Sequence, residues 1–385
     1  MNYCNFKKHY AVIFCIMVIS LIFCSCSVNI ENNEENTTDK ILTEKTNSDI
    51  DLSNCYFYDV KVLSNGDYIK FYITNDEDSL LKYMEIINAE NSKVKSTIDL
   101  SKYYMKNVNF KCLDNSFYIY GNEIGVYDYN GMFIKSIIYP KDIEQSISDY
   151  TFALSNDLSK MVYNFKIEDE EEDKIGIKLL DLNTNEETVI QNLNEPVTDK
   201  PCDYNSLHFS ADDKKVMFLG QRYLTINNGK DCYGVIDLNS LSIKSDFVKD
   251  SYCCFVKDSG YVYDKNVEYG KNSSGEIIKF DQSGNAETIL LENKNESQHI
   301  GLTDNENMFL SILCNRSDYS IEIKLYENGK AIKKSDIKCK DEEEFNLINV
   351  DNVCYSSKSN KVYYSSIVWN GDEYMGNEYF ELEMK

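Results

Sequence analysis

The stretch FSADDKKVMFLGQRYLTINNGKDCYGVIDLNSLSIKS, from Phe209 to Ser245, decides the fold. It begins at the end of an apolar strand and passes through a polar turn at 211–214 into an apolar strand at 216–219. A longer polar segment is followed by a strand at 233–238, a short turn at 239–241 and a last strand. Apolar runs separated by Asn, Asp, Ser and Gly turns are typical of antiparallel hairpins. The stretch therefore predicts one four-stranded antiparallel unit.

The first turn of this unit recurs seven times. The copies are VLSNGDYIKF (62–71), CLDNSFYIY (112–120), LSNDLSKMVY (154–163), FSADDKKVMF (209–218), VKDSGYVY (256–263), LTDNENMFL (302–310) and YSSKSNKVYY (355–364). The second hairpin recurs at 81–98, 124–138, 175–190, 233–247, 275–291 and 321–337, and its seventh copy at 378–385 has only one strand. Four-stranded units repeated every ~40–50 residues indicate a β-propeller. We expect an all-β chain with one seven-bladed propeller over residues 40–385.

The incomplete last copy raises the question of how the ring closes. A missing outer strand in a propeller is often supplied by the other end of the chain, because an uncovered edge strand promotes aggregation. The sequence predicts that residues 40–46 (KILTEKT) fill this place. The alternative is a frayed last blade, with residues 40–54 serving only as a linker.

The chain is acidic, and its charge excludes one class of partner. The formal net charge is −24, and it becomes −26 without residues 1–25, which contain Lys7 and Lys8 and no acid. Such a field repels nucleic acid and favours cations or basic partners. We therefore expect no nucleic-acid binding. Solubility alone is the other explanation for the charge.

The N-terminus has the composition of a signal peptide. Lys7 and Lys8 precede an apolar run from Tyr10 to Cys24, which is shorter than the ~20 residues of a membrane span. The run ends in LIFCSC (21–26) and resembles a bacterial lipobox, in which a small residue precedes the cysteine that is acylated. Ser25 suits cleavage before Cys26, whereas Phe23 before Cys24 does not. The resemblance implies a signal peptide at 1–25 and an acylated Cys26; the alternative is a short uncleaved anchor.

A polar segment follows this cysteine. Residues 26–39 contain Cys26 and the run SVNIENNEENTTD, which as a flexible coil would span on the order of 20 Å. The resemblance to a lipobox thus implies a protein held by acyl chains, such as palmitate, at the extracytoplasmic face of a bacterial cell membrane.

The repeats also resemble a known family. Residues 154–181 and 209–238 combine an S-x-D turn, an apolar strand and a strand ending in LLDL or VIDL. In this they are similar to the WD-repeat-like propellers of the TolB type, over roughly residues 55–385. The resemblance implies the fold and not a ligand. TolB has a further N-terminal domain that finds no counterpart here, so its envelope partners are not implied.

The second connection of each unit is expected to be the binding surface. These connections are the longer ones, at 167–174, 220–232, 264–275, 314–319 and 369–377, and loops on a rigid scaffold commonly carry function. Trp, Tyr and Arg are the usual binding anchors. The candidate residues are Arg222, Tyr223, Tyr269, Arg316, Tyr319, Trp369 and Tyr374.

Other residue patterns indicate no catalytic or metal site. The acidic runs 168–173 and 341–344 lack the spacing of a calcium loop and are interpreted as solvated charge. His208 and His299 fall on innermost strands, where a structural role is expected. Nine cysteines remain beyond the N-terminus, mostly in or beside strands and without metal-ligand spacing, so we expect no disulfide framework. Nothing predicts a cofactor.

These features together predict a lipid-anchored, extracytoplasmic propeller that binds or scaffolds a protein or a small ligand. Two alternatives remain open. One is a sensor or accessory subunit of an envelope complex, and the other is a propeller enzyme, a lyase or glycosidase, acting on polysaccharide.

Overall fold

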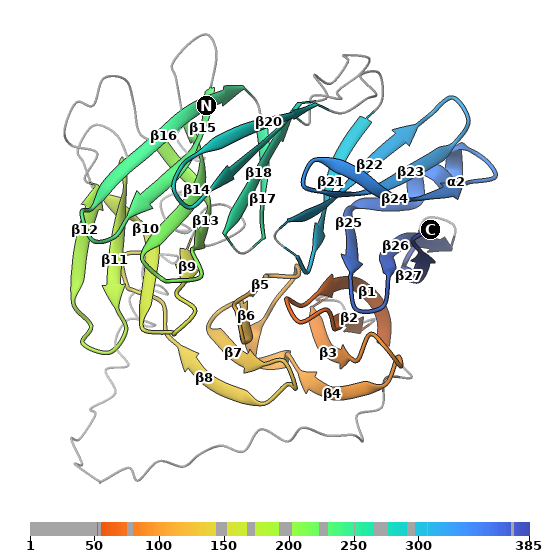
Figure 1. Cartoon of the computed structure of the whole chain (residues 1–385). Helices are drawn as coiled ribbons and strands as arrows, with labels where there is room; N and C mark the ends of the chain where they lie inside the picture. Colours follow the sequence, from red (N-terminus) through yellow and green to blue (C-terminus); the bar gives the residue numbers. More distant parts are fainter. Residues whose placement is uncertain are drawn as a thin grey trace, which may run out of the picture. The chain divides into compact units, whose positions relative to one another are not determined.

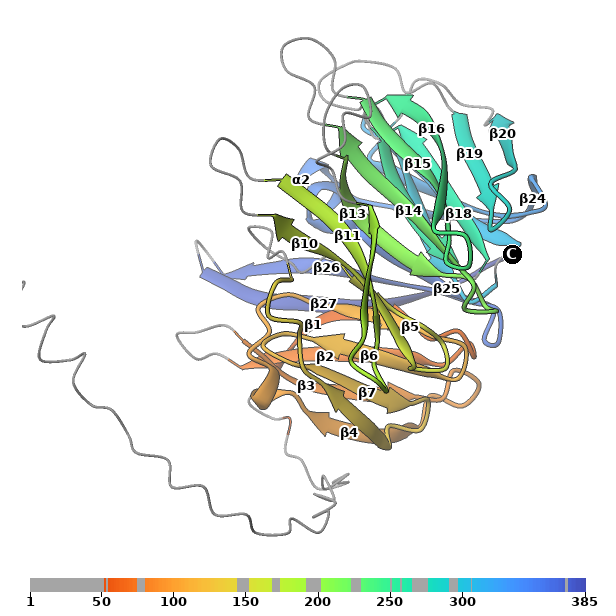
Figure 2. The same ribbon diagram turned by 90° about the vertical axis from the view of Figure 1, so that its left-hand side faces the viewer.

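Each repeat folds into an antiparallel sheet in the computed structural model, as Figures 1 and 2 show in two views. The described residues are 52, 55–74, 80–143, 152–167, 174–191, 202–222, 230–249, 251–256, 258–264, 276–290, 297–305, 307–370 and 373–385. The predictions for Cys26, for the tether and for residues 40–46 lie outside these residues.

The strands form the seven blades of a β-propeller, which confirms the predicted fold class. Blade 1 contains β1 (Cys55–Val62), β2 (Tyr68–Thr74), β3 (Leu81–Ile87) and β4 (Val94–Asp99). Blade 2 contains β5 (Phe110–Cys112), β6 (Ser116–Tyr120), β7 (Ile124–Asp128) and β8 (Phe133–Ile137). Blade 3 contains β9 (Phe152–Leu154), β10 (Lys160–Ile167), β11 (Lys174–Asp181) and β12 (Glu187–Gln191). Blade 4 contains β13 (Cys202–Phe209), β14 (Lys215–Arg222), β15 (Lys230–Asp237) and β16 (Ser242–Lys249).

Blade 5 contains β17 (Ser251–Val256), β18 (Ser259–Asp264), β19 (Glu276–Asp281) and β20 (Ala286–Leu290). Blade 6 contains β21 (Ser297–Thr303), β22 (Met308–Asn315), β23 (Ser320–Glu327) and β24 (Lys330–Lys338). Blade 7 contributes β25 (Ile348–Ser356), β26 (Lys361–Asn370) and β27 (Glu373–Glu383). Two short helices are described, η1 (Ser101–Tyr103) and α2 (Glu342–Leu347). All seven first turns predicted from the sequence connect the first two strands of their blade.

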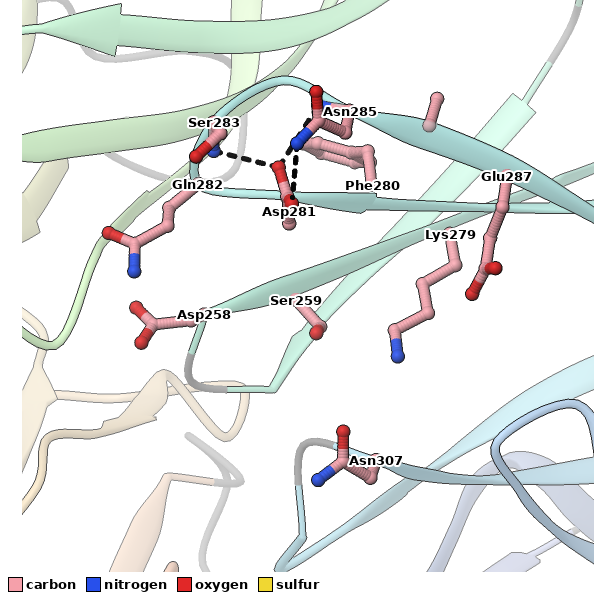
Figure 3. A pocket seen from close by; sticks show the side chains of 11 residues that line it. Asp258, Ser259, Lys279, Phe280, Asp281, Gln282, Ser283, Asn285, Glu287 and Asn307 are labelled. Carbon is pink, nitrogen blue, oxygen red and sulfur yellow. Dashed lines mark hydrogen bonds between the residues drawn. The ribbon is translucent and has the colours of Figure 1, made fainter.

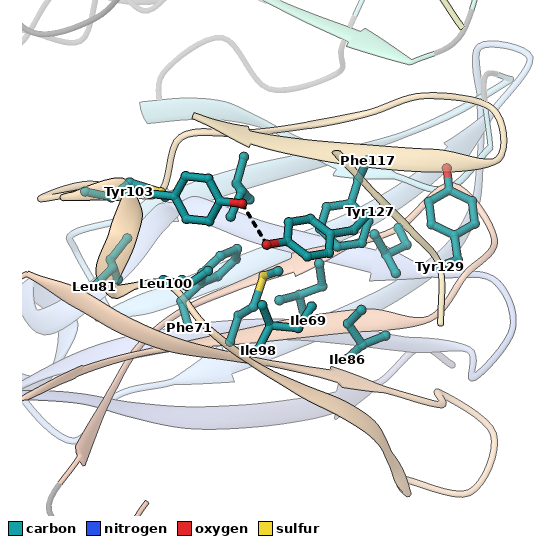
Figure 4. Close-up of a cluster of buried hydrophobic side chains, with 14 of the residues drawn as sticks. Ile69, Phe71, Leu81, Ile86, Ile98, Leu100, Tyr103, Phe117, Tyr127 and Tyr129 are labelled. Atoms are coloured by element: carbon teal, nitrogen blue, oxygen red, sulfur yellow. Dashed lines mark hydrogen bonds between the residues drawn. The ribbon is translucent and has the colours of Figure 1, made fainter. Parts of the chain in front are cut away.

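The blades are held together by apolar side chains that pack between neighbouring sheets. Figure 4 shows the cluster between blades 1 and 2, which includes Ile69 and Phe71 of β2 and Phe117 of β6. Tyr103 of η1 and Tyr127 of β7 meet in this cluster, with their hydroxyl oxygens 2.7 Å apart. Alternating apolar residues of each strand thus supply the faces that adjacent blades share.

Blade 7 packs directly against blade 1. Tyr379 of β27 contacts Phe57 of β1 with ring centroids 5.5 Å apart, and Tyr68 of β2 stacks on Tyr363 of β26 at 4.4 Å. The Lys70 ammonium lies 3.5 Å from the Tyr379 ring centroid. These contacts bring the two ends of the described propeller together through side chains.

Polar contacts join the same two blades nearer the central strands. The Lys61 ammonium donates to Asn352 Oδ1 at 2.7 Å, and the Lys358 ammonium lies 2.8 Å from Asp67 Oδ1. Burial acts to raise the pKa of Asp67, but hydrogen bonds lower it below its usual value, and the bond from the Lys358 ammonium contributes most to this lowering. This ion pair holds the first turn of blade 1 against that of blade 7.

Blades 6 and 7 share one sheet, which the repeats did not predict. β21 and β25 are innermost strands and pair in parallel through Leu302–Cys354 and Thr303–Tyr355, giving the order β24-β23-β22-β21-β25-β26-β27. This pairing fixes the two blades to each other through the backbone, in addition to side-chain packing.

The acidic run 341–344 begins a helix, where the sequence was interpreted only as solvated charge. Asp341 is the N-cap of α2, and its side chain accepts from the Glu344 amide at 2.9 Å. The Glu344 carboxylate in turn accepts from the Lys340 amide at 2.8 Å. Acids at the first turn are stabilised by the unpaired amides and the positive end of the helix dipole.

Candidate functional site

The strand order places two kinds of connection at opposite ends of each blade. Because all four strands of a blade are antiparallel, the first and third connections lie at one end, which we call the tight-turn end. The second connections and the segments between blades lie at the other, which we call the long-loop end. The predicted segregation of connections is therefore confirmed.

Neighbouring blades are linked at the tight-turn end by acids that accept backbone hydrogen bonds. Asp213 of blade 4 accepts from the amides of Asn156 and Asp157 of blade 3, at 2.7 and 3.0 Å. Asp258 of blade 5 accepts from the Ala211 amide at 2.7 Å. Asp304 of blade 6 accepts from the Ser357 amide at 2.9 Å. These carboxylates have a structural role, since each one satisfies a backbone donor of an adjacent turn.

The S-x-D sequence of the first turn has a clear structural basis in blades 3 and 4. The Ser155 hydroxyl donates to Asp157 and accepts from the Lys160 amide, and Ser210 makes the same two contacts with Asp212 and Lys215. Such side-chain bonds replace the backbone partners that a tight turn lacks.

An aspartate at the end of the third strand holds the third turn in four consecutive blades. Asp128, Asp181, Asp237 and Asp281 each accept two backbone amides from the turn that follows. These bonds, led by the one from the Thr184 amide, lower the pKa of Asp181. They explain why the LLDL and VIDL strands end in aspartate.

A polar pocket of about 500 Å³ opens at the tight-turn end of blade 5, where it meets the first turn of blade 6 (Figure 3). Its walls come from the first and third turns of blade 5, from strands β19 and β20, and from Asn307. The lining residues are Asp258, Ser259, Lys279, Phe280, Asp281, Gln282, Ser283, Asn285, Ala286, Glu287 and Asn307. Rigid hairpins position all of these side chains except that of Asn307, which precedes β22.

Charges of both signs meet in this pocket. Lys279 and Glu287 are cross-strand partners on β19 and β20, and Figure 3 shows their side chains lying side by side. Burial acts to raise the pKa of Asp281, but hydrogen bonds from the Asn285 and Ser283 amides outweigh it, so this carboxylate stays ionised and fixes the turn. The pocket can therefore bind a ligand that carries a positive group together with a negative or hydroxyl group. The groups available for this are the charged side chains of Lys279, Glu287 and Asp258 and the side-chain amides of Gln282 and Asn307.

The structure brings together only some of the predicted site residues. Trp369 and Tyr374 are cross-strand partners in the β26–β27 hairpin, and Arg316 and Tyr319 share the four-residue turn between β22 and β23. Arg222 ends β14 opposite Cys202 of β13. Tyr223 and Tyr269 lie outside the described residues.

Two of the expected long loops are short. The connection predicted at 314–319 is a turn of residues 316–319, and the one predicted at 369–377 is reduced to residues 371–372 because β26 and β27 extend to Asn370 and Glu373. Aromatic residues favour strands, so Trp369 and Tyr374 continue the sheet. Tyr319 is half-buried, with its ring 6.3 Å from that of Phe345, and packs against the core. It is a packing residue more than an exposed anchor.

The histidines and cysteines have the predicted positions in strands. His208 lies on β13 and His299 on β21, both innermost strands, and the His208 ring stacks on Phe255 at 5.5 Å. Cys112, Cys339 and Cys354 are free thiols, and burial raises the pKa of both Cys112 and Cys354 to about 12. Within the described ranges, no group of three or more His, Cys, Asp or Glu side chains is arranged to hold a metal ion.

Sequence reasoning missed the pocket because its lining comes from three separate segments of two blades. The available signal was the turn FDQSGNAE (280–287), whose polar residues lie at the tight-turn end. The search for large anchors was directed instead to the opposite end.

Comparison with known proteins supports the fold. No family model matches the chain, and no curated protein matches it. Among solved structures, a prolyl endopeptidase matches with a TM-score of 0.51 and 13% identity, over 86% of this chain and 48% of that one. Prolyl oligopeptidase B from Galerina marginata matches with a TM-score of 0.49 and 13% identity, over 81% and 47%.

The β-propeller domain of the Trilobed protease from Pyrococcus furiosus matches with a TM-score of 0.42 and 13% identity, over 86% of this chain and 84% of that domain. The chain thus spans about half the length of the two peptidases above. At 13% identity, the likeness to the prolyl endopeptidase shows the propeller fold alone. In the part of the chain that the structure describes, no helix is long and apolar enough to cross a membrane.

Proposed function

We propose that the chain is a membrane-anchored extracytoplasmic lipoprotein whose propeller binds a protein or a small ligand. The anchor is proposed from the basic start, the apolar run 10–24 and the Ser25–Cys26 pair. Membership of the TolB-type, WD-repeat-like propellers is proposed from the S-x-D turns and the LLDL and VIDL strands. Its support is that these residues make equivalent hydrogen bonds in blades 3 and 4.

The observation that carries the binding role is the polar pocket of blade 5. A cavity of about 500 Å³ is large enough for a small ligand or for a few residues of a peptide. Its charged residues are held on paired strands, so a ligand would meet groups that are already oriented. Lys279 would bind an anionic group, and Glu287 and Asp258 would bind cationic or hydroxyl groups.

The second candidate surface is the long-loop end of the propeller. The β26–β27 hairpin places Trp369 opposite Tyr374 there, and Arg222 ends β14 at the same end of its own blade. Trp and Arg are frequent binding anchors, and truncation of a true anchor costs ≥2 kcal/mol, about thirtyfold in affinity.

One experiment distinguishes the two surfaces. Chemical cross-linking on intact cells captures a partner, whose affinity is then measured for variants of the full chain. Lys279→Ala and Glu287→Gln test the pocket, and Trp369→Ala and Arg222→Ala test the long-loop end. Asn239→Ala, on the third turn of blade 4, is the control. We expect the pocket variants to weaken binding while their melting temperature stays that of the wild type. If both sets of variants keep the wild-type affinity, neither surface is the binding site.

Two alternative functions lead to different experimental results. An accessory or sensor subunit would co-purify with a membrane complex. A polysaccharide lyase or glycosidase would release reducing ends from polymer.

A further inference from the structure

Most of the exposed large apolar side chains belong to blades 1 and 2 and the segment between them. Seven large hydrophobic side chains are exposed among the described residues, and five of them lie between 94 and 138. These five, which we call the blade 1–2 rim, are Val94, Tyr104, Met132, Ile134 and Ile138. The other two, Val189 and Ile332, lie on the outermost strands of blades 3 and 6. Single exposed apolar residues are ordinary, whereas a cluster indicates a contact surface.

Three members of the rim lie in or beside one strand. Met132 precedes β8, Ile134 lies within it and Ile138 follows it. The residues between them, Phe133 and Ile137, are less exposed. Ile138 is 84% exposed. β8 is the outermost strand of its blade.

Blades 1 and 2 support the rim as one rigid surface. The Lys95 ammonium of β4 donates to the Tyr129 carbonyl at 2.8 Å, which ties blade 1 to the turn before β8. The Lys102 ammonium lies 4.8 Å from the ring centroids of Phe133 and Tyr103. Tyr103 is buried in the core that the two blades share, and it fixes the neighbouring Tyr104 at the surface.

Lysines also exceed acids in the segment that carries the rim. Residues 93–141 contain seven lysines and four acids, a net charge of +3 in a chain of −24. Four of these lysines are exposed, namely Lys93, Lys102, Lys106 and Lys141, whereas the Lys95 ammonium is bonded to Asp67 and to the Tyr129 carbonyl. Lysines beside exposed Tyr, Ile and Met are suited to a lipid–water interface, because apolar side chains enter it while ammonium groups stay at anionic headgroups.

We propose that the blade 1–2 rim lies against the anionic membrane surface to which the chain is anchored. This inference rests on the proposed lipid anchor. The first strand of the propeller is β1 of blade 1, which begins at Cys55, 29 residues after Cys26. The anchor therefore keeps blade 1 within reach of the lipid, and the adjoining apolar and basic rim supplies the contact that orients the propeller.

The test compares two tryptophans introduced at matched positions. Ile134 and Val189 are each 45% exposed on the outermost strands of their blades. Ile134→Trp and Val189→Trp are made separately in a Trp369→Phe background. Each full-length lipidated chain is reconstituted in vesicles of phosphatidylglycerol and phosphatidylcholine that carry bromine on their acyl chains. Acylation of Cys26 is measured in the same preparation.

The expected result is severalfold stronger quenching with Ile134→Trp than with Val189→Trp. The quenching of Ile134→Trp should fall when Lys93→Gln, Lys106→Gln and Lys141→Gln are combined with it. It should also fall in salt near 1 M, where the Debye length is about 3 Å. If the two tryptophans are quenched equally on a chain that carries acyl groups, the rim contact is refuted and the proposed lipid anchor is unaffected. Protection of Ile134→Trp that requires another envelope protein would assign the rim to that protein. A chain without acyl groups would refute both anchor and rim.

Discussion

Gly125 of β7 shows how little space the propeller leaves between blades. A Cβ at this position would overlap the Tyr103 hydroxyl and lie 2.8 Å from its Cε1. Tyr103 is held in place by the shared core and by its contact with Tyr127 (Figure 4). The sequence IGVYD contained no sign of this requirement, because Tyr103 comes from another blade's connection.

Gly125→Ala should therefore destabilise the protein by about 1–3 kcal/mol, the usual cost of overpacking. Urea denaturation followed by fluorescence measures this change. Tyr103→Leu replaces the ring and its hydroxyl by a smaller side chain. The double variant of Gly125→Ala and Tyr103→Leu should therefore recover part of the stability that Gly125→Ala loses. Full stability of Gly125→Ala alone would show that Tyr103 does not approach β7 as described.

At the same scale, Asp157 makes the first turn of blade 3 sensitive to acid. Burial acts to raise the pKa of Asp157, but hydrogen bonds from Ser155 and Ser159 lower it to about 2. Its unfolded pKa is about 3.9, so the stability that its ionised form contributes is present above pH 4 and is lost as pH falls towards 2.

Thermal unfolding should show Asp157→Asn melting below wild type at pH 7, with the difference shrinking as pH approaches 2. Glu90→Gln, at an exposed position, is the control and should follow wild type throughout. A difference that stays constant over this range would show that the carboxylate's charge is not what stabilises the turn.

Among the elements, hairpins were predictable from sequence and contacts between blades were not. Turn residues and apolar alternation located all seven first turns, since both signals are local. The lengths of β26 and β27 were misjudged because polar residues around Trp369 and Tyr374 were interpreted as a loop. The pocket and the parallel β21–β25 pairing depend on segments far apart in sequence, for which a single sequence carries no local signal.

The contact of β27 with blade 1 has a testable energetic value. Tyr379 contacts Phe57 and the Lys70 ammonium, so Tyr379→Ala should cost about 2–4 kcal/mol, somewhat less than a fully buried aromatic. Tyr379→Phe keeps the ring and loses only the hydrogen bonds of its hydroxyl, to Glu381 at 2.8 Å and with Tyr68, so it should cost about 1 kcal/mol. Equal losses in the two variants, measured by urea denaturation, would contradict a ring contact between the blades.

For the whole molecule, the fold and the proposed location come from different parts of the chain. The repeats specify the propeller, and the described residues confirm it. The location is proposed from residues 1–26, and the basic, apolar rim of blades 1 and 2 is consistent with it in a chain that is otherwise strongly acidic. Binding at the blade 5 pocket would then occur at the extracytoplasmic face of the membrane.

The mass of the N-terminal peptide of the chain, purified from bacterial membranes, tests this account most directly. We predict a peptide that begins at Cys26 and carries acyl chains. Cys26→Ala should retain residues 1–25, and Cys24→Ala should be processed as wild type. A mature chain that begins elsewhere without an acyl group, or loss of acylation in Cys24→Ala alone, would contradict it.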